Sequence, residues 1–428
     1  MKEIGQISCA PIEQTRLLSI HSFVLSLLLV GSEFLGPGYI YAGMVVYLFL
    51  LVLLKKALIY KGVIKIVFIP LLLIYLGLIG FVSNPMYLAL KDGWYYSNII
   101  VPILFGYFIA EKTNQFKALF QVFIICAVVA SGLHVMKFVK NPVEQFAMVA
   151  DIRTEYGGGT FLSVIGVSVI LLSKYYSIRV FRRKLFENTA FLLCFASLIL
   201  SFSRTYWIST VIMVFMGIIG LKRIKYIFFL ACIVVVFFLF FRNGTKNLNI
   251  EKGTIAYKFA HSLEEIMPSD YYIRGDIAKD WRGYETFHGF QSYLDGSIFN
   301  LILGHGFGKL ADMKTFMLLG SEKIRYIPIL HNGYIFVLLK TGIVGLILYF
   351  LYIVKFIRLG LQASRMSDSR VLFAGRIIVG LGVVFLFTTY VICGMFNKSS
   401  LFSAMVLLGS MVGFLDKNEE RNCDIEKI

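Results

Sequence analysis

The stretch HNGYIFVLLKTGIVGLILYF, residues 331–350, decides the fold of this 428-residue chain. His331 and Asn332 open a mostly apolar run that continues to about residue 360 and is interrupted at Thr341 and Gly342. About 20 apolar residues in a helix cross the ~30 Å hydrocarbon layer of a bilayer. The stretch therefore predicts a broken helix that starts at a polar pair and spans a membrane over 342–360.

The composition extends this interpretation to the whole chain. Hydrophobic residues make up 58% of it, charged residues only 16%, and the mean hydropathy is +0.77, which one soluble core cannot accommodate. We predict an all-α, polytopic membrane protein with about twelve spans. The first apolar run has no small-residue cleavage site after it and is interpreted as a retained span. The predicted spans are 17–35, 39–57, 63–83, 95–111, 116–138, 159–174, 187–203, 205–221, 225–242, 342–360, 371–393 and 399–415.

Positive charge in the short loops predicts the orientation. Loops after even-numbered spans are basic, whereas those after odd-numbered spans, such as 36–38 and 393–399, are poor in charge. Cytoplasmic loops carry the excess of Lys and Arg, so both termini are predicted in the cytoplasm. The net charge of +17 is then explained by topology and anionic lipid, and nucleic acid is not a predicted partner. The basic loop residues are Lys55, Lys56, Lys61, Lys65, Lys112, Lys117, Lys174, Arg179, Arg182, Arg183, Lys184, Lys222, Arg223, Lys225, Arg358, Arg365 and Arg370.

The chain divides into spans one to nine at 1–242, a long outer loop at 243–341, and spans ten to twelve with a cytoplasmic tail at 342–428. We expect the loop to fold as a small helical cap, with short helices at 262–267 and 276–293. Breakers are Pro268 and the glycine cluster 304–308. The cysteines contain no C-x-x-C pair and imply neither a disulfide framework nor a metal cluster. They are Cys9, Cys126, Cys194, Cys232, Cys393 and Cys423.

An arginine interrupts the apolar stretch 191–220. Basic residues flank both ends of the stretch, so the chain must cross outward and return, with a turn near Ser201, Ser203, Arg204 and Thr205. Two spans of ~16 residues at ~1.5 Å per residue reach only ~24 Å, which would leave Arg204 slightly below the outer surface. It is either a snorkelling helix-end cation or part of an anion site with the neighbouring hydroxyls, and we favour the anion site.

The outer loop supplies further basic candidates in YYIRGDIAKDWRGYETF, residues 271–287. Arg274 precedes Gly275, where the backbone can approach a ligand closely, and a guanidinium binds phosphate oxygens in a two-pronged contact. Arg282 and Glu285 are explained equally well as an i,i+3 ion pair on a solvated surface.

Two histidines belong to the loop. His305 lies in the glycine turn GHGFG, residues 304–308, and is interpreted as structural. His331 stands at the start of the apolar helix. A histidine there is often merely interfacial, but an imidazole can accept a proton from a sugar hydroxyl near neutral pH, and it lies on the same side of the membrane as the arginines.

Together these motifs resemble the O-antigen ligase and polymerase superfamily of bacterial membrane glycosyltransferases, which includes lipopolysaccharide O-antigen ligases and Wzy-type polymerases. The resemblance covers about residues 190–350. It rests on SRTYW at 203–207, the segment 274–281, GHGFG at 304–308, HNGY at 331–334, and the glycines Gly342 and Gly345.

The resemblance implies an inverting glycosyltransferase of the bacterial inner membrane that works without a metal or other cofactor. It also implies that His331 is the base on the acceptor hydroxyl, and that Arg204 and Arg274 bind undecaprenyl pyrophosphate. The sequence itself also predicts a reaction without a metal. The long loop has no D-x-D pair to bind a divalent ion, and the first outer loop is only the turn 36–38. Guanidinium groups must then meet the pyrophosphate charge. Further candidates for substrate binding are Arg282, Glu285, Arg153 and Tyr334.

Three activities stay open. A polymerase joins lipid-linked repeat units, and a ligase transfers the glycan to lipid A core by the same chemistry; the resemblance of the motifs favours the polymerase. A transporter for the lipid-linked glycan would show internal symmetry and charges at mid-membrane, and we find no repeat. The expected partners are a lipid-linked donor and acceptor and the bilayer, and a chain-length regulator stays open.

Overall fold

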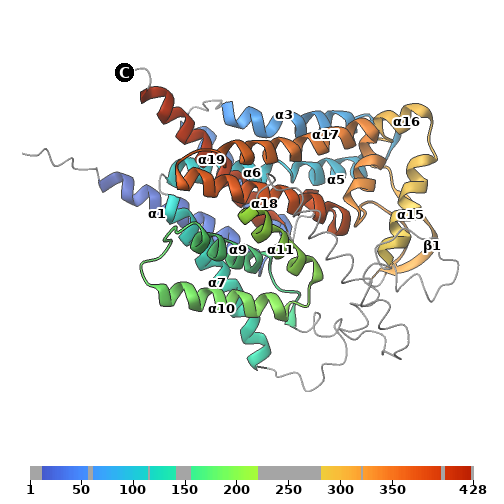
Figure 1. Ribbon diagram of the computed structural model, residues 1–428. Coiled ribbons are helices and arrows are strands. Elements are labelled where there is room, and N and C mark those ends of the chain that lie inside the picture. The colour runs from blue at the N-terminus through green and yellow to red at the C-terminus, as the bar shows by residue number, and fades with distance from the viewer. Residues whose placement is uncertain are drawn as a thin grey trace, which may run out of the picture.

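The computed structural model describes residues 12–55, 61–113, 116–140, 156–219, 281–319, 322–396 and 401–425. They form a bundle of apolar helices with a small cap at one end (Figure 1). Among these residues, six helical segments are long and apolar enough to cross a membrane, and three shorter apolar helices accompany them. The chain is thus an all-α, polytopic membrane protein, while the number of spans stays a prediction.

The bundle helices follow the predicted apolar runs. The expected turn between the seventh and eighth spans is confirmed, since α10 ends at Leu200 and α11 begins at Arg204. The span predicted at 225–242 and the short helix at 262–267 lie outside the described residues. The bundle helices are α1 Ile12–Gly31, α2 Pro37–Lys55, α3 Lys61–Gly77, α4 Gly80–Ser83, α5 Met86–Ser97, α6 Val101–Thr113, α7 Phe116–Lys140, α9 Phe161–Tyr175, α10 Lys184–Leu200, α11 Arg204–Ile219, α17 Gly333–Ala363, α18 Ser369–Ile392 and α19 Phe402–Ile425.

Glycines bring pairs of these helices into backbone contact. A Cβ on Gly106 of α6 would lie 2.0 Å from the carbonyl oxygen of Val406 in α19, and one on Gly409 would lie 1.9 Å from that of Ile103. Because lipid tails are as apolar as the helices, association in a bilayer depends on such close packing. The small residues therefore determine that α6 and α19 are neighbours.

The break predicted in the helix after His331 is confirmed. Gly342 has φ 65° and ψ −167° in the middle of α17, a conformation that only glycine adopts readily. The helix begins at Gly333, so its first part belongs to the outer loop of the sequence-based division and its second part to the tenth predicted span.

The cap is not purely helical, which corrects the expectation from the sequence. An antiparallel hairpin, β1 and β2, follows α15 and α16, with Ala311 paired to Ile327 and Leu319 to Glu322. The physical reason is the alternation of charged and apolar residues over 323–327, which favours a strand. The cap elements are α15 Trp281–Leu294, α16 Ile298–Leu303, β1 Ala311–Leu319, β2 Glu322–Ile327 and the 3-10 helix η3 Gly394–Phe396.

Candidate functional site

His331 and Glu285 form the centre of the candidate site. Imidazole Nδ1 of His331 lies 2.6 Å from Oε2 of Glu285, and the His331 backbone N–H donates to Oε1 at 2.9 Å. The carboxylate side chain is only 2% exposed, whereas the imidazole is 48% exposed. A buried carboxyl group thus fixes both the backbone and the ring of a histidine that is about half exposed.

The start of α17 holds His331 in place. The Asn332 side chain accepts hydrogen bonds from the N–H groups of Tyr334 and Ile335, at 3.1 and 3.4 Å, and so caps the helix. The carbonyl of His331 accepts a hydrogen bond from the Cys393 N–H at 2.5 Å. His331 is therefore fastened to the ends of two bundle helices as well as to the cap.

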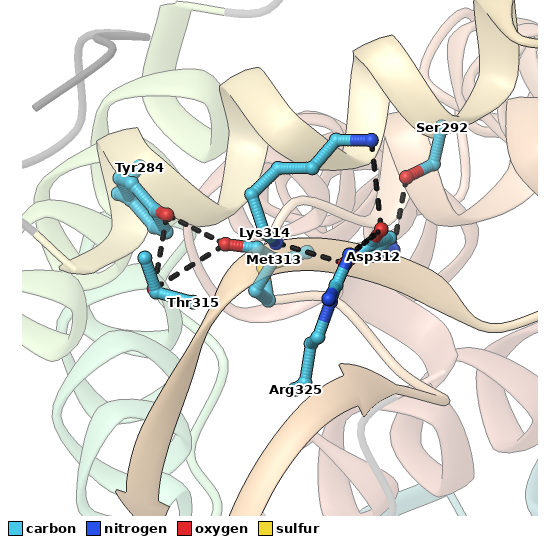
Figure 2. A network of polar contacts seen from close by, with 7 residues as sticks. All are labelled: Tyr284, Ser292, Asp312, Met313, Lys314, Thr315 and Arg325. Carbon is cyan, nitrogen blue, oxygen red and sulfur yellow. Dashed lines mark hydrogen bonds and ion pairs between the residues drawn. The ribbon is translucent and has the colours of Figure 1, made fainter. Parts of the chain in front are cut away.

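Glu285 is positioned by α15, which packs on the hairpin (Figure 2). The Tyr284 hydroxyl donates to the carbonyl of Met313 at 2.6 Å, and the Asp312 N–H donates to the Ser292 hydroxyl at 3.0 Å. Tyr284 is 1% exposed. Contacts at both ends of α15 thus fix the helix that presents Glu285 to His331.

A cross-strand ion pair closes the hairpin beside α15. The Arg325 guanidinium contacts both oxygens of Asp312, with Nε to Oδ1 at 2.7 Å and Nη2 to Oδ2 at 2.8 Å (Figure 2). This two-pronged contact holds the pKa of the Asp312 carboxyl well below its ordinary value. Asp312 therefore stays ionised throughout the physiological range and keeps β2 on β1.

The glycine turn 304–308 completes the hydrogen bonding of α17. The break at Gly342 deprives the carbonyls of Leu339 and Lys340 of their partners within the helix. The N–H groups of His305 and Gly306 replace them, at 3.0 Å each. The turn therefore supplies the hydrogen bonds that the break removes from the helix.

The other side of the turn docks on the α3–α5 region. The Phe307 N–H donates to the carbonyl of Gly77, where α3 ends, at 2.8 Å, and Asn84 Nδ2 donates to the carbonyl of Phe307 at 2.9 Å. Gly306 has φ +79°, and a Cβ there would lie 2.2 Å from the backbone nitrogen of Gly80. Burial lowers the pKa of His305, whose Nε2 lies 3.0 Å from the Tyr293 carbonyl, in keeping with its interpretation as structural.

A buried ion pair beneath the turn was missed in the sequence. Lys340 Nζ lies 2.6 Å from Oδ2 of Asp92 in α5, and their side chains are 0% and 1% exposed. The same oxygen accepts a hydrogen bond from the Gly308 N–H at 2.6 Å, and Lys340 also donates to the carbonyl of Lys309. One signal was visible: a lysine inside the apolar run YIFVLLKTG requires a partner.

Arg204 lies at the same end of the bundle as His331. Tyr176 donates a hydrogen bond to the carbonyl of Gly217, near the end of α11, and its ring lies 6.0 Å from that of Phe373, near the start of α18. The two helices are therefore antiparallel, and Arg204 at the start of α11 lies at the end of α18, where that helix meets His331. The arginine is partly buried, and its depth in the membrane stays a prediction.

The other predicted site residues have different placements. Tyr334 donates its hydroxyl to the carbonyl of Leu386 at 2.7 Å, a contact that joins α17 to α18, and a substrate role for it stays a prediction. Arg282 lies partly buried in the first turn of α15, one turn before Glu285. Arg153 and Arg274 lie outside the described residues.

The pairing of Glu285 with His331 could not be read from the sequence, where Arg282 offered Glu285 a local partner. The two residues are 46 positions apart. Within the described ranges, no group of three or more His, Cys, Asp or Glu residues is arranged to hold a metal ion.

Residues 189–350 match the family model described as O-antigen ligase. The matched segment contains Arg204, Glu285 and His331, as well as the glycine turn and the break in α17. None of the curated proteins matches the chain significantly. Over this segment the protein is similar to O-antigen ligases, and its apolar helices are those of a polytopic membrane protein.

Proposed function

We propose that this chain, whose residues 189–350 match the O-antigen ligase family model, transfers a glycan from undecaprenyl pyrophosphate to an acceptor hydroxyl on the periplasmic face of the bacterial inner membrane. The observation that carries the proposal is the contact between the buried Glu285 carboxylate and the half-exposed His331 imidazole. A base must reach its substrate while something else fixes its tautomer and orientation. The pair meets both requirements.

The chemistry follows from the two ring nitrogens. When Nδ1–H donates to Glu285, the lone pair of Nε2 is left to accept a proton. We propose that Nε2 takes the proton of the acceptor hydroxyl as its oxygen attacks the anomeric carbon. The bond from that carbon to the pyrophosphate oxygen then breaks with inversion, and lipid pyrophosphate leaves with the electron pair. Glu285 stabilises the imidazolium that forms.

The arginines have a complementary role. Arg204 and Arg274 are proposed to bind the pyrophosphate and to neutralise the charge that develops on it, with Arg282 and Arg153 as further candidates. Arg204 lies at the His331 end of the bundle, beside the end of α18, where a lipid-held pyrophosphate could meet the exposed ring. No step in this scheme requires a metal.

We propose the polymerase as the specific activity, with an undecaprenyl-pyrophosphate-linked repeat unit as acceptor. The ligase is the second candidate, because the matching family model is described as O-antigen ligase. A deletion strain distinguishes the two. Loss of a polymerase leaves a single repeat unit on the lipid A core, whereas loss of a ligase leaves bare core.

The base is tested by replacing His331 with Ala and measuring glycan product from purified protein and lipid-linked substrate. The rate should fall by about 10²- to 10³-fold or more, with membrane insertion and chromatographic behaviour unchanged. His21→Gln, at a histidine that contacts Tyr47 inside the bundle, is the matched control and should stay near normal. Normal product from His331→Ala would refute the assignment, and product formed in vitro would exclude a transporter as the sole activity.

A further inference from the structure

A cavity of about 340 Å³ lies at the end of α17 opposite to His331. α17, α3 and α19 contribute its walls. Because α17 starts at Gly333 and ends at Ala363, the cavity lies at the end of this helix that is far from the candidate site. Its lining residues are Lys65, Leu351, Val354, Lys355, Phe356, Arg358, Leu359, Gln362, Val412 and Glu419.

The cavity carries an excess of positive charge. Lys65 is partly neutralised, since its Nζ lies 3.2 Å from Asp416 and 3.9 Å from Glu419. The Lys355 ammonium donates to the backbone carbonyl of Lys65 at 2.6 Å. Within the part of the chain that the structure describes, no carboxylate forms an ion pair with Lys355 or Arg358. Two cations therefore remain for an external anion.

Most of the rest of the lining is apolar, and its α17 part is exposed at Leu351. Leu351, Val354, Lys355 and Arg358 follow one another at helical spacing along one face of α17. Leu351 is 49% exposed, so the wall is open toward the hydrocarbon layer. A cationic rim above an apolar wall fits a molecule with a phosphate at one end and a hydrocarbon chain at the other. A free nucleotide or sugar phosphate would leave that wall exposed.

We propose that this cavity binds an anionic phospholipid. Its phosphate would lie between Lys355 and Arg358, and one acyl chain would follow Leu351 and Val354 along α17. On the orientation predicted from the loop charges, the lipid belongs to the cytoplasmic leaflet, where basic pockets between helices bind acidic head groups. The site is independent of glycan transfer.

The test measures retained lipid on the purified full-length protein by native mass spectrometry, with phosphatidylglycerol as probe and phosphatidylcholine as neutral comparison. Wild-type protein should prefer phosphatidylglycerol. The double variant Lys355→Gln/Arg358→Gln should bind it about tenfold more weakly or worse. The matched control is Arg365→Gln/Arg370→Gln, which removes two exposed cations at the same end of the bundle but outside the cavity, and it should keep the wild-type preference.

A third variant protects the test against misfolding of the double variant. Glu419→Gln removes the carboxylate from the cavity lining and should strengthen phosphatidylglycerol binding. Equal binding of the two lipids by wild-type protein, equal losses in both double variants, or weaker binding by Glu419→Gln would each overturn the proposal. Competition by inorganic phosphate at equal concentration would also overturn it, because it would show a site for a soluble anion.

Discussion

At the scale of single residues, Glu285 is held from several sides. Its carboxylate is almost fully buried and contacts both the backbone and the ring of His331. Burying a carboxylate is costly unless charged or hydrogen-bonding partners compensate. If Glu285 only formed a surface ion pair with Arg282, its carboxylate would not need to be buried. The placement therefore favours a positioning role for Glu285.

Replacing Glu285 with Gln should lower kcat by about 10²- to 10⁴-fold with little change in KM. An amide can offer its NH₂ group to Nδ1, which would leave the proton on Nε2, and it cannot stabilise an imidazolium. The measurement is the initial rate of glycan transfer over a range of pH, in which the variant should also lose the wild-type pH profile. Asp295→Asn, at an exposed carboxylate of the same cap, is the control. A variant with the wild-type rate and profile would contradict the role.

At the scale of secondary-structure elements, the Asp92–Lys340 pair fastens α5 and the glycine turn to the break in α17. Among the described residues, Oδ1 of Asp92 has no hydrogen-bond partner, so the carboxylate depends on Lys340 and Gly308. The pair thus supports the short helical segment that carries His331 at its start.

Lys340→Met should destabilise the protein by about 3–5 kcal/mol, because it leaves a buried charge unpaired. The double variant Asp92→Asn/Lys340→Met should recover most of this loss, because replacing both members of a buried pair is often close to neutral. Thermal unfolding of the wild type, the two single variants Asp92→Asn and Lys340→Met, and the double variant in one detergent measures the coupling. If the double variant were as unstable as the sum of the two single changes, the pair would not act as a unit.

The hairpin gives a pH-dependent prediction. Arg325 lowers the pKa of Asp312 in the folded protein, so the contribution of this carboxylate to stability is present above its ordinary pKa of about 4. That contribution is lost as the pH falls toward the folded value. Arg325→Gln should therefore speed amide hydrogen exchange in 311–316 at neutral pH, whereas Lys323→Gln, an exposed neighbour in β2, should not. If the two variants exchanged alike, the ion pair would not stabilise the hairpin.

At the scale of the whole molecule, the two ends of the bundle differ in chemistry. Arg204, Glu285 and His331 lie at one end, and the basic cavity around Lys355 and Arg358 lies at the other. Cytoplasmic ends of membrane helices carry the excess of basic residues. On the orientation predicted from the loop charges, the candidate site would lie outside the cytoplasm.

Single cysteines at Asp295 and Arg365, both exposed, test this orientation. A membrane-impermeant maleimide should label Asp295→Cys in intact spheroplasts, and Arg365→Cys only after permeabilisation. Of the six natural cysteines, Cys126, Cys194 and Cys393 are buried, and the unmodified protein sets the labelling background from all six. The reverse labelling pattern would place the candidate site in the cytoplasm and would exclude a periplasmic reaction.

Much of this architecture was predictable from local pattern. Apolar runs predicted the bundle helices, loop charges predicted the turn at Arg204, and a threonine–glycine pair predicted the break at Gly342. These features depend on residues close together in the chain. Other features depend on contacts between segments far apart in the chain: the partner of Glu285, the partner of Lys340 and the packing of the glycine turn. A single sequence does not show which of several possible distant partners a residue contacts. The hairpin was missed because the glycine cluster and helical spacing elsewhere in the loop outweighed a short alternating run.

The contact between Glu285 and His331 has one more consequence. It closes the intervening segment 286–330, which contains α16 and the hairpin, into a loop whose two ends are held together. Lengthening a surface loop costs little, about 0.6 kcal/mol for each doubling. A change in the length of this segment should therefore cost little stability as long as Glu285 and His331 stay in contact.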